Sequence, residues 1–291
     1  MLARPDEIAA IQWYHTIELP GGVVTPGFYD HRPLLAHLPL PASLAGQRCL
    51  DIAGSDGFWA FEMWRRGARE VISVDLEDGS RQDWQGASHA RRALAASSGR
   101  WEGDTGRTRR GFELARAALG ADVERRDVSA YDVSPKAVGT FDFVFMGSLL
   151  LHLRDPVGAL IAARSVTAGR FLVLEPVLLS LSLLFRHTPL ASLWQLDEPR
   201  WWLPNIAGLR RFVHAAGFRV LDSGGPRAQR FGRAFPRLPP RRRPTFSELV
   251  FWSLVRPLGV PSAWVLAEPV ASAAQLPADE PPARVPALGW I

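Results

Sequence analysis

The sequence predicts an α/β fold built on a doubly wound parallel sheet. Short apolar runs that end in an acidic or small residue alternate with stretches whose apolar residues recur at helical spacing. Glycines and prolines separate many of these stretches. The strand–helix order recurs five times, which is typical of a parallel sheet covered by helices on both faces.

The first unit of this pattern is a strand, a glycine-bearing turn and a helix. An apolar run ends at Ile52, residues 53–57 form the turn, and Gly67 closes the apolar helix that follows. Such a turn presents free backbone N–H groups at a helix start, where a ligand can approach closely. The next strand ends at Asp75, an acid that can accept the ribose hydroxyls of a nucleotide-like ligand. The alternative is a tight turn in which Asp75 only caps a helix.

The later elements continue this order. Gly120 ends one predicted helix, Asp155 and Pro156 begin another over 157–166, and Asn205 begins the last, which stops before Gly217. The predicted later strands are 122–128, 141–147, 169–175, 218–221 and 263–267.

Composition limits which classes of protein and which partners are compatible with the sequence. The chain has 291 residues, 47% of them hydrophobic, and a net charge of +5 that comes almost entirely from arginine. A basic chain is compatible with RNA as a partner but is weak evidence for it. Cys49 is the only cysteine, which excludes an internal disulfide and fits a reducing compartment. The apolar run over 171–185 is interrupted and shorter than a membrane span, so we expect a cytoplasmic protein that does not enter a membrane.

We divide the chain into an N-terminal cap segment over 1–44, a main domain over 45–268 and a Pro/Ala-rich tail over 269–291. The cap is rich in aromatic residues and histidine, and we expect it to close over a ligand; packing on the sheet is the alternative. Within the domain, residues 78–107 read as a surface insertion. Residues 223–260 read as a basic loop, which is either solvated or contacts phosphate.

At this point the chain resembles class I S-adenosylmethionine-dependent methyltransferases. The resemblance covers about residues 44–268 and is carried by 50–57, Asp75, Asp127 and 141–152. It is closest to the branch that contains the tRNA uridine-34 methyltransferases and carboxymethyltransferases. It implies a Rossmann-like, seven-stranded sheet, S-adenosylmethionine as cofactor and a small-molecule or tRNA acceptor.

The resemblance also implies roles for individual residues. The turn would border the methionine part of the cofactor; Ala53 and Ser55 stand where the family usually has glycine, which predicts a slightly wider loop. Asp75 would accept the ribose hydroxyls, and Asp127 would lie beside the adenine amino group. The implied cofactor-binding residues are Asp51, Ala53, Gly54, Ser55, Gly57, Asp75, Leu76, Asp127, Val128, Met146, Gly147 and Ser148.

Two histidines are candidate catalytic bases for transfer to an oxygen or nitrogen nucleophile. His152 follows the fourth strand and His15 lies in the cap; each could instead be structural. No histidines have metal-ligand spacing, so no metal is expected. A cofactor-binding module without catalytic activity is the alternative to an enzyme.

We expect the transferred group to be methyl rather than carboxymethyl. The related carboxymethyltransferase neutralises its cofactor's extra carboxylate with a lysine, a tyrosine and an arginine. This chain has His15, Leu150-Leu151 and Ser262 at the corresponding places. A carboxylate facing leucine would lose several kcal/mol, about the cost of an unpaired buried polar group. Wobble-uridine carboxymethylation therefore stays the alternative function.

Overall fold

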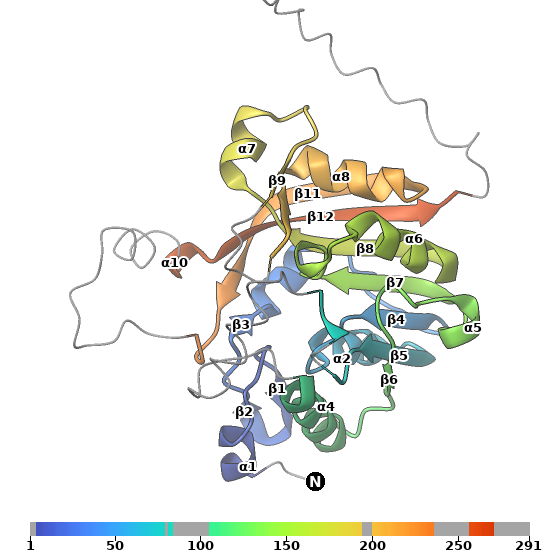
Figure 1. Ribbon diagram of the computed structural model, residues 1–291. Coiled ribbons are helices and arrows are strands. Elements are labelled where there is room, and N and C mark those ends of the chain that lie inside the picture. Colours follow the sequence, from blue (N-terminus) through green and yellow to red (C-terminus); the bar gives the residue numbers. More distant parts are fainter. Residues whose placement is uncertain (1–3, 79–80, 84–104, 194–199, 236–255, 271–291) are drawn as a thin grey trace, which may run out of the picture.

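An eight-stranded mixed sheet forms the centre of the molecule (Figure 1). The structure is a computed structural model that describes residues 4–78, 81–83, 105–193, 200–235 and 256–270. The strand order is β3-β11-β12-β8-β7-β4-β5-β6. The predicted doubly wound α/β fold is therefore confirmed, with one strand more than the seven expected.

The five strands nearest the predicted ligand turn are parallel to one another. They are β4 (Arg48–Ile52), β5 (Glu70–Asp75), β6 (Glu124–Asp127), β7 (Phe141–Gly147) and β8 (Thr167–Pro176). The sheet continues through β12 (Val260–Pro269), β11 (Phe218–Phe231) and the short β3 (Tyr29–Asp30). The chain order reverses between β4 and β7, which is where open α/β sheets form a ligand crevice at the carboxyl ends of their strands.

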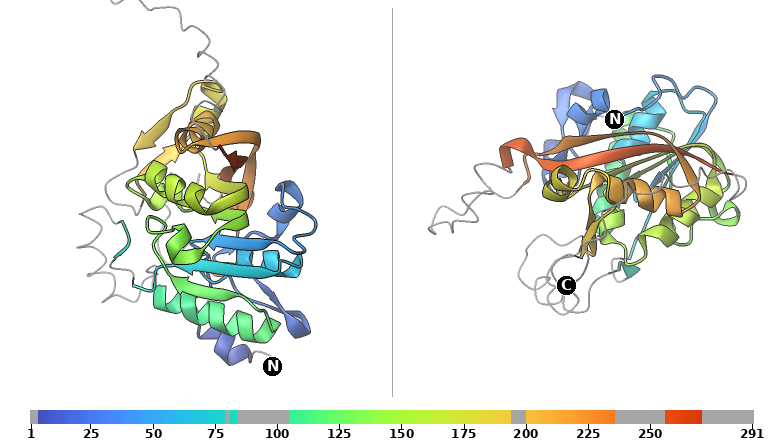
Figure 2. Two further views of the ribbon diagram at one scale, coloured as in Figure 1. Left: turned by 90° about the vertical axis from the view of Figure 1, so that its right-hand side faces the viewer. Right: turned by 90° about the horizontal axis from the view of Figure 1, so that it is seen from above.

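Helices cover both faces of the sheet (Figure 2). On one face lie α2 (Phe58–Arg65) and α4 (Thr105–Leu119), and on the other lie α5 (Pro135–Val138), α6 (Pro156–Val166) and α8 (Ile206–Ala215). The predicted caps are confirmed, because Asp155 accepts from the Gly158 N–H at 2.8 Å and Asn205 from the Gly208 N–H at 2.7 Å. Each cap satisfies a backbone donor that the first helical turn leaves without a partner.

The N-terminal segment is joined to the sheet as well as packed on it. It contains α1 (Pro5–Ala9), β1 (Glu18–Leu19), η1 (Pro20–Gly22), β2 (Val23–Val24), β3 and η2 (Arg32–His37). β3 pairs with the end of β11, and Trp13 is fully buried with its Nε1–H donating to the Ile8 carbonyl at 3.0 Å. The segment therefore packs on the sheet, as the alternative interpretation predicted, and closure of the segment over a ligand stays a prediction.

A small extension follows β8. It consists of α7 (Leu179–Leu184), β9 (Ala191–Leu193) and β10 (Trp202–Pro204), and the 3-10 turn η4 (Leu150–His152) follows β7. The remaining helical turn is α10 (Arg256–Leu258). Within the described ranges, no helix combines the length and apolar character needed to cross a bilayer.

Three expectations about the end of the sheet are wrong. β12 runs antiparallel to both of its neighbours, so the sheet is mixed. The first part of the loop predicted over 223–260 is a strand, because β11 continues to Phe231 through two register shifts. The glycines and proline that suggested a loop accompany these irregularities, and a Cβ on Gly224 would lie 2.6 Å from the Trp264 ring. The predicted tail also begins too early, since β12 includes Pro269. Residues 236–255 of this loop, most of the insertion and residues 271–291 lie outside the described residues.

Candidate functional site

A cavity of about 230 Å³ lies where the carboxyl ends of β4, β5 and β7 meet the N-terminal segment. One end is lined by residues of the β4 and β5 turns and of the loop after β6, and the other by the N-terminal segment and the loop after β7. Of the predicted site residues, the wall contains His15, Ala53, Ser55, Asp75, Leu76, Val128, Gly147, Ser148 and His152. The fold therefore brings together residues that are far apart in the chain.

The turn after β4 is held in a glycine-type backbone. Ala53 and Ser55 have φ values of 63° and 52°, and Gly57 has 90°. A left-handed conformation costs a residue with a side chain about 1–2 kcal/mol. A Cβ on Gly54 would lie 2.0 Å from the Ser73 hydroxyl oxygen, so a side chain cannot fit there. Alanine and serine thus adopt the left-handed conformation that glycine would take without strain.

An ion pair beneath the cavity wall holds this turn. Asp75 Oδ2 accepts from the Ser55 N–H at 2.8 Å, and Oδ1 accepts from the Leu76 N–H at 2.8 Å. Arg125 Nη1 donates to the Ser55 carbonyl at 2.5 Å, and Nη2 lies 3.5 Å from Asp75 Oδ2. Burial raises the pKa of Asp75, and the Arg125 charge opposes that rise. Asp75 and Arg125 together therefore hold both sides of Ser55.

Five predicted residues lie outside the cavity wall. Asp51 is buried beneath the turn, accepts from the Ala60 N–H at 3.2 Å and has its pKa raised to about 7, chiefly by burial and then by Asp75. Asp127 is paired with Arg81, whose Nη1 lies 2.9 and 3.0 Å from the two carboxylate oxygens. The others are Gly54, Gly57 and Met146, the last a residue of the buried core.

A buried carboxylate joins the N-terminal segment to the turn. Asp56 is fully buried, and its Oδ2 accepts from the backbone N–H groups of Tyr14 and His15, each at 2.8 Å. Its Oδ1 is in short hydrogen-bond contact with His15 Nδ1. Asp56 was missed in the sequence because it resembles an ordinary turn acid and its partners lie 41 and 42 positions away.

A second histidine lines the cavity beside the first. His31 Nε2 is 2.9 Å from Gln229 Oε1, and the Gln229 amide donates to the Ser262 hydroxyl at 2.7 Å and to that of Ser148 at 3.1 Å. Burial, followed by the charge of His15, holds the pKa of His31 well below its usual range. His31 is therefore neutral at pH 7. Gln229 was missed because its strand was read as loop.

The loop after β7 is held by another buried acid. Glu175, at the end of β8, accepts from the N–H groups of Leu149 and Leu150 at 2.8 and 3.0 Å. Burial raises the pKa of Glu175 to about 8. The loop places His152 in the cavity wall. The sequence signal for Glu175 is its position as an acid at the end of an apolar strand.

One side of the cavity is closed by residues 81–83. The Asp83 carboxylate accepts from the Tyr131 hydroxyl and from the Arg154 N–H, the latter at 2.9 Å, and its carbonyl accepts from Trp201 Nε1 at 2.6 Å. These partners belong to loops that follow three different parts of the sheet. The first part of the insertion therefore closes the wall near Tyr131.

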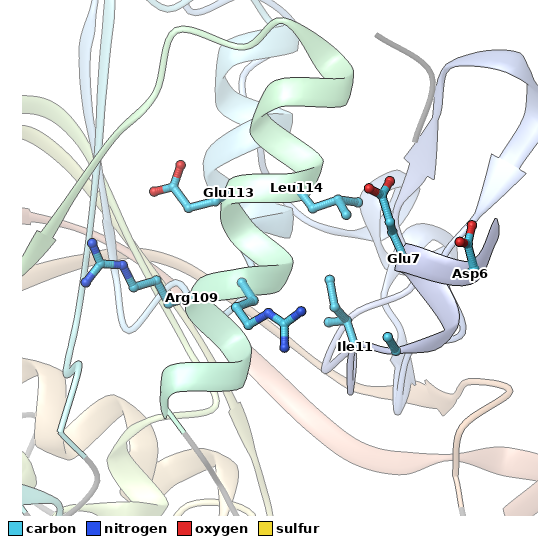
Figure 3. A pocket seen from close by; sticks show the side chains of 8 residues that line it. Asp6, Glu7, Ile11, Arg109, Glu113 and Leu114 are labelled. Carbon is cyan, nitrogen blue, oxygen red and sulfur yellow. The ribbon is translucent and has the colours of Figure 1, made fainter. Parts of the chain in front are cut away.

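A second hollow lies between α1 and α4, away from this cavity (Figure 3). Ile11 and Leu114 lie between the two helices, while Arg109 and Glu113 point away from α1 (Figure 3). Arg109 pairs with Glu77 at 2.6 Å. The labelled charged side chains of this hollow do not point toward one another, so we assign no site there (Figure 3). In the described ranges, no cluster of three or more histidine, cysteine or acidic side chains could hold a metal ion.

Comparisons with known proteins found similarity only among solved structures, since no family model and no curated protein sequence matches the chain. An S-adenosylmethionine-dependent methyltransferase from Mesorhizobium loti is 12% identical, with a TM-score of 0.42 over 81% of this chain and 95% of that one. An O-methyltransferase family protein from Burkholderia thailandensis is 13% identical, with a TM-score of 0.47 over 82% and 56%.

A third is 1,6-didemethyltoxoflavin-N1-methyltransferase from Burkholderia thailandensis, whose structure holds 1,6-didemethyltoxoflavin and S-adenosylhomocysteine. It is 15% identical, with a TM-score of 0.44 over 82% of this chain and 77% of that one. At these values the likeness transfers no residue role to this chain. Its function is therefore argued from its own cavity.

Proposed function

We propose that the cavity binds S-adenosylmethionine and that the protein is a methyltransferase acting on an oxygen or nitrogen nucleophile. The observation that carries this proposal is Asp75, a carboxylate at the end of β5 that lines the cavity beside a glycine-type turn. Two hydrogen bonds orient its oxygens, and its side chain remains 18% exposed. A carboxylate so placed can accept the two hydroxyls of a ribose.

The residues at this end of the cavity fit the other parts of the cofactor. Leu76 and Val128 supply apolar walls for the adenine, and Ala53 and Ser55 border the methionine part. Gly54 lets the turn pack directly against Ser73 and Asp51, and Asp51 supports the turn from beneath. Asp127 would act through Arg81, the residue that it holds in the cavity wall.

Gly147 and Ser148 extend the proposed cofactor site toward the acceptor end. When bound, S-adenosylmethionine supplies a methyl group on a positively charged sulfur. Transfer needs alignment of the acceptor and exclusion of water, and a base where the acceptor carries a proton. His15 and His152 are the candidate bases, since both lie in the wall at this end.

The surroundings of His15 support methyl rather than carboxymethyl transfer. At the three places where the related branch neutralises a carboxylate, His15 is engaged by Asp56, Leu150 is buried, and Ser262 accepts from Gln229. None of these residues offers a positive charge to a cofactor carboxylate. A carboxylated cofactor would bind more weakly, because burying its unpaired anionic group costs free energy.

Isothermal titration with S-adenosylmethionine and S-adenosylhomocysteine tests the proposal directly. We expect both to bind, and ordinary S-adenosylmethionine to bind more tightly than its carboxylated relative in a competition titration. Absence of binding by either would overturn the cofactor assignment. Tighter binding of the carboxylated cofactor would instead restore wobble-uridine carboxymethylation as the leading function.

The acceptor class is decided by a separate labelling experiment. Methyl-labelled cofactor is incubated with the protein and either total tRNA or a small-molecule extract. We expect label in the small-molecule fraction, because residues of the N-terminal segment, Tyr14, His15 and His31, line the cavity. Label in tRNA would support the nucleic-acid alternative, and cofactor binding without transfer to either fraction would support the inactive module.

A further inference from the structure

We propose that the acceptor is a neutral, planar molecule with an ionisable O–H or N–H group, and that His15, oriented by Asp56, removes its proton. This inference rests on the proposed function and adds the acceptor class and the positioning residue. Its first basis is the contact between Asp56 and His15, both buried against the wall of the cavity.

The geometry of Asp56 determines which nitrogen of His15 carries the proton. Oδ2 is already occupied by two backbone N–H groups, and Oδ1 meets Nδ1 of the ring. A carboxylate can only accept, so Nδ1 must be the protonated nitrogen. In the neutral ring with Nδ1 protonated, Nε2 keeps its lone pair, which is the form that a base requires.

The same contacts fix the position of the ring. The backbone at Tyr14 and His15 is held by Asp56, and the His15 ring stacks on Phe58 at 5.5 Å between centroids. Thr25 accepts from the Ile17 N–H at 2.8 Å and donates to the His15 carbonyl at 2.9 Å. His15 therefore cannot swing away from the cavity without breaking several buried hydrogen bonds.

The walls around His15 favour a neutral, planar occupant. Rings of Tyr14, His31 and Trp59 line this end, and His31 is neutral because of its burial. Arg81 is the cation in the described wall, and its guanidinium is paired with Asp127. Arg200 lies outside this wall, although its charge acts on Tyr14 and Tyr29. Within the wall an anionic acceptor would meet an arginine that is already paired, whereas a flat ring can stack on the aromatic side chains.

The acceptor's O–H or N–H proton passes to Nε2 of His15, which becomes imidazolium beside the Asp56 carboxylate. The acceptor's oxygen or nitrogen forms a bond to the methyl carbon while the carbon–sulfur bond breaks, and that electron pair goes to sulfur. The products are the methylated acceptor, neutral S-adenosylhomocysteine and a proton held by His15.

The tautomer of His15 is the first test. In ¹⁵N-labelled protein at pH 7.5, long-range ¹H–¹⁵N correlation should show His15 protonated at Nδ1. Asp56→Asn keeps an oxygen for the two backbone N–H groups but turns an NH₂ toward Nδ1, so the proton should move to Nε2. Asp30→Asn is the matched control, because Asp30 pairs with Arg32 in the same segment away from the cavity, and it should leave the tautomer unchanged.

An Nε2–H tautomer or a doubly protonated ring in the unaltered protein would overturn the proposal, as would an unchanged tautomer in Asp56→Asn. Binding of S-adenosylhomocysteine is measured on the same samples. A normal tautomer shift without cofactor binding would refute the proposed function but not the pairing of His15 with Asp56. Cofactor binding by a protein whose His15 is protonated at Nε2 would refute only this inference.

The acceptor class is tested with three matched probes on protein saturated with S-adenosylhomocysteine. They are 1-naphthol, 1-methoxynaphthalene and 1-naphthoate. We expect 1-naphthol to bind at least about tenfold more tightly than the others and to shift the His15 Nε2 resonance, because only it donates to Nε2 without carrying a charge. Tighter binding of 1-naphthoate, or no binding of 1-naphthol, would overturn the assignment.

Discussion

The two ends of the cavity are each organised by a carboxylate, one partly exposed and one buried, and the two carboxylates work differently. Asp75 receives N–H groups from residues next to the strands and is balanced by Arg125, which lies on the neighbouring strand β6. Asp56 receives its N–H groups from Tyr14 and His15, far away in the chain, and meets a histidine instead of an arginine.

This difference bears on the two proposed roles, which are cofactor binding at Asp75 and proton transfer at His15. An arginine carries a permanent charge, so the pair with Asp75 holds one geometry at any ordinary pH. A histidine can gain and lose a proton near neutral pH, so its pair with Asp56 can take part in proton transfer. The first end is suited to holding a ligand, and the second to changing one.

The largest effect should come from removing Asp56. Asp56→Ala deletes the acceptor of two backbone N–H groups and leaves a buried histidine without its partner. We expect a loss of about 3–5 kcal/mol in the free energy of unfolding, as for other broken buried pairs. Urea unfolding measures it, and Asp30→Ala should cost about 1 kcal/mol or less because its partner Arg32 is partly exposed. Similar losses in both variants would show that Asp56 has no special role.

The matching change at the other end should affect binding. Asp75→Ala removes the proposed charge-assisted hydrogen bonds to the ribose, and affinity for S-adenosylhomocysteine should fall by about 2 kcal/mol, or roughly thirtyfold. Isothermal titration measures it, with circular dichroism to establish that the variant is folded. Unchanged affinity in a folded variant would contradict the placement of the ribose.

Glu175 should make stability depend on pH. Its folded pKa of about 8 is raised above the ordinary value of 4.5, so between these pH values the folded state holds a proton that the unfolded state has lost. The free energy of unfolding should therefore fall as the pH rises from about 4.5 to 8, by up to about 1.4 kcal/mol per pH unit. Glu175→Gln cannot titrate, and Asp51 contributes equally to both proteins.

The measurement is urea unfolding of both proteins at several pH values. The stability of the unaltered protein relative to Glu175→Gln should decrease steadily across this range. A difference that does not vary with pH would mean that Glu175 is ionised in the folded state.

The smallest effect should come from the turn. Ser55 has a left-handed backbone, and glycine adopts that conformation without the steric cost. Ser55→Gly should therefore raise the free energy of unfolding by up to about 1 kcal/mol, reduced by the greater entropy of glycine in the unfolded chain. Thermal unfolding measures it. The control is Ser43→Gly, at an exposed position outside the turn; equal effects would show that the turn stores no strain.

Much of the sheet was predictable because its signals are local. The apolar runs of β4, β5, β7 and β8 and the caps Asp155 and Asn205 act within a few residues of themselves. β11 was predicted too short, because Gly224 was read as a loop residue. Its packing against Trp264 depends on a partner strand that local pattern does not reveal.

The sequence by itself determined the α/β class, the turn after β4 and the place of Asp75, because strand, turn and acid follow one another closely. Only the tertiary structure decided which residues meet at the proposed acceptor end. Asp56 meets His15, and Gln229 meets His31 198 positions away. Such pairs depend on how the N-terminal segment joins the sheet through β3 and β11, and no local preference encodes that. The physical reason is that buried polar groups are satisfied by whatever the fold brings near them, which is independent of distance along the chain.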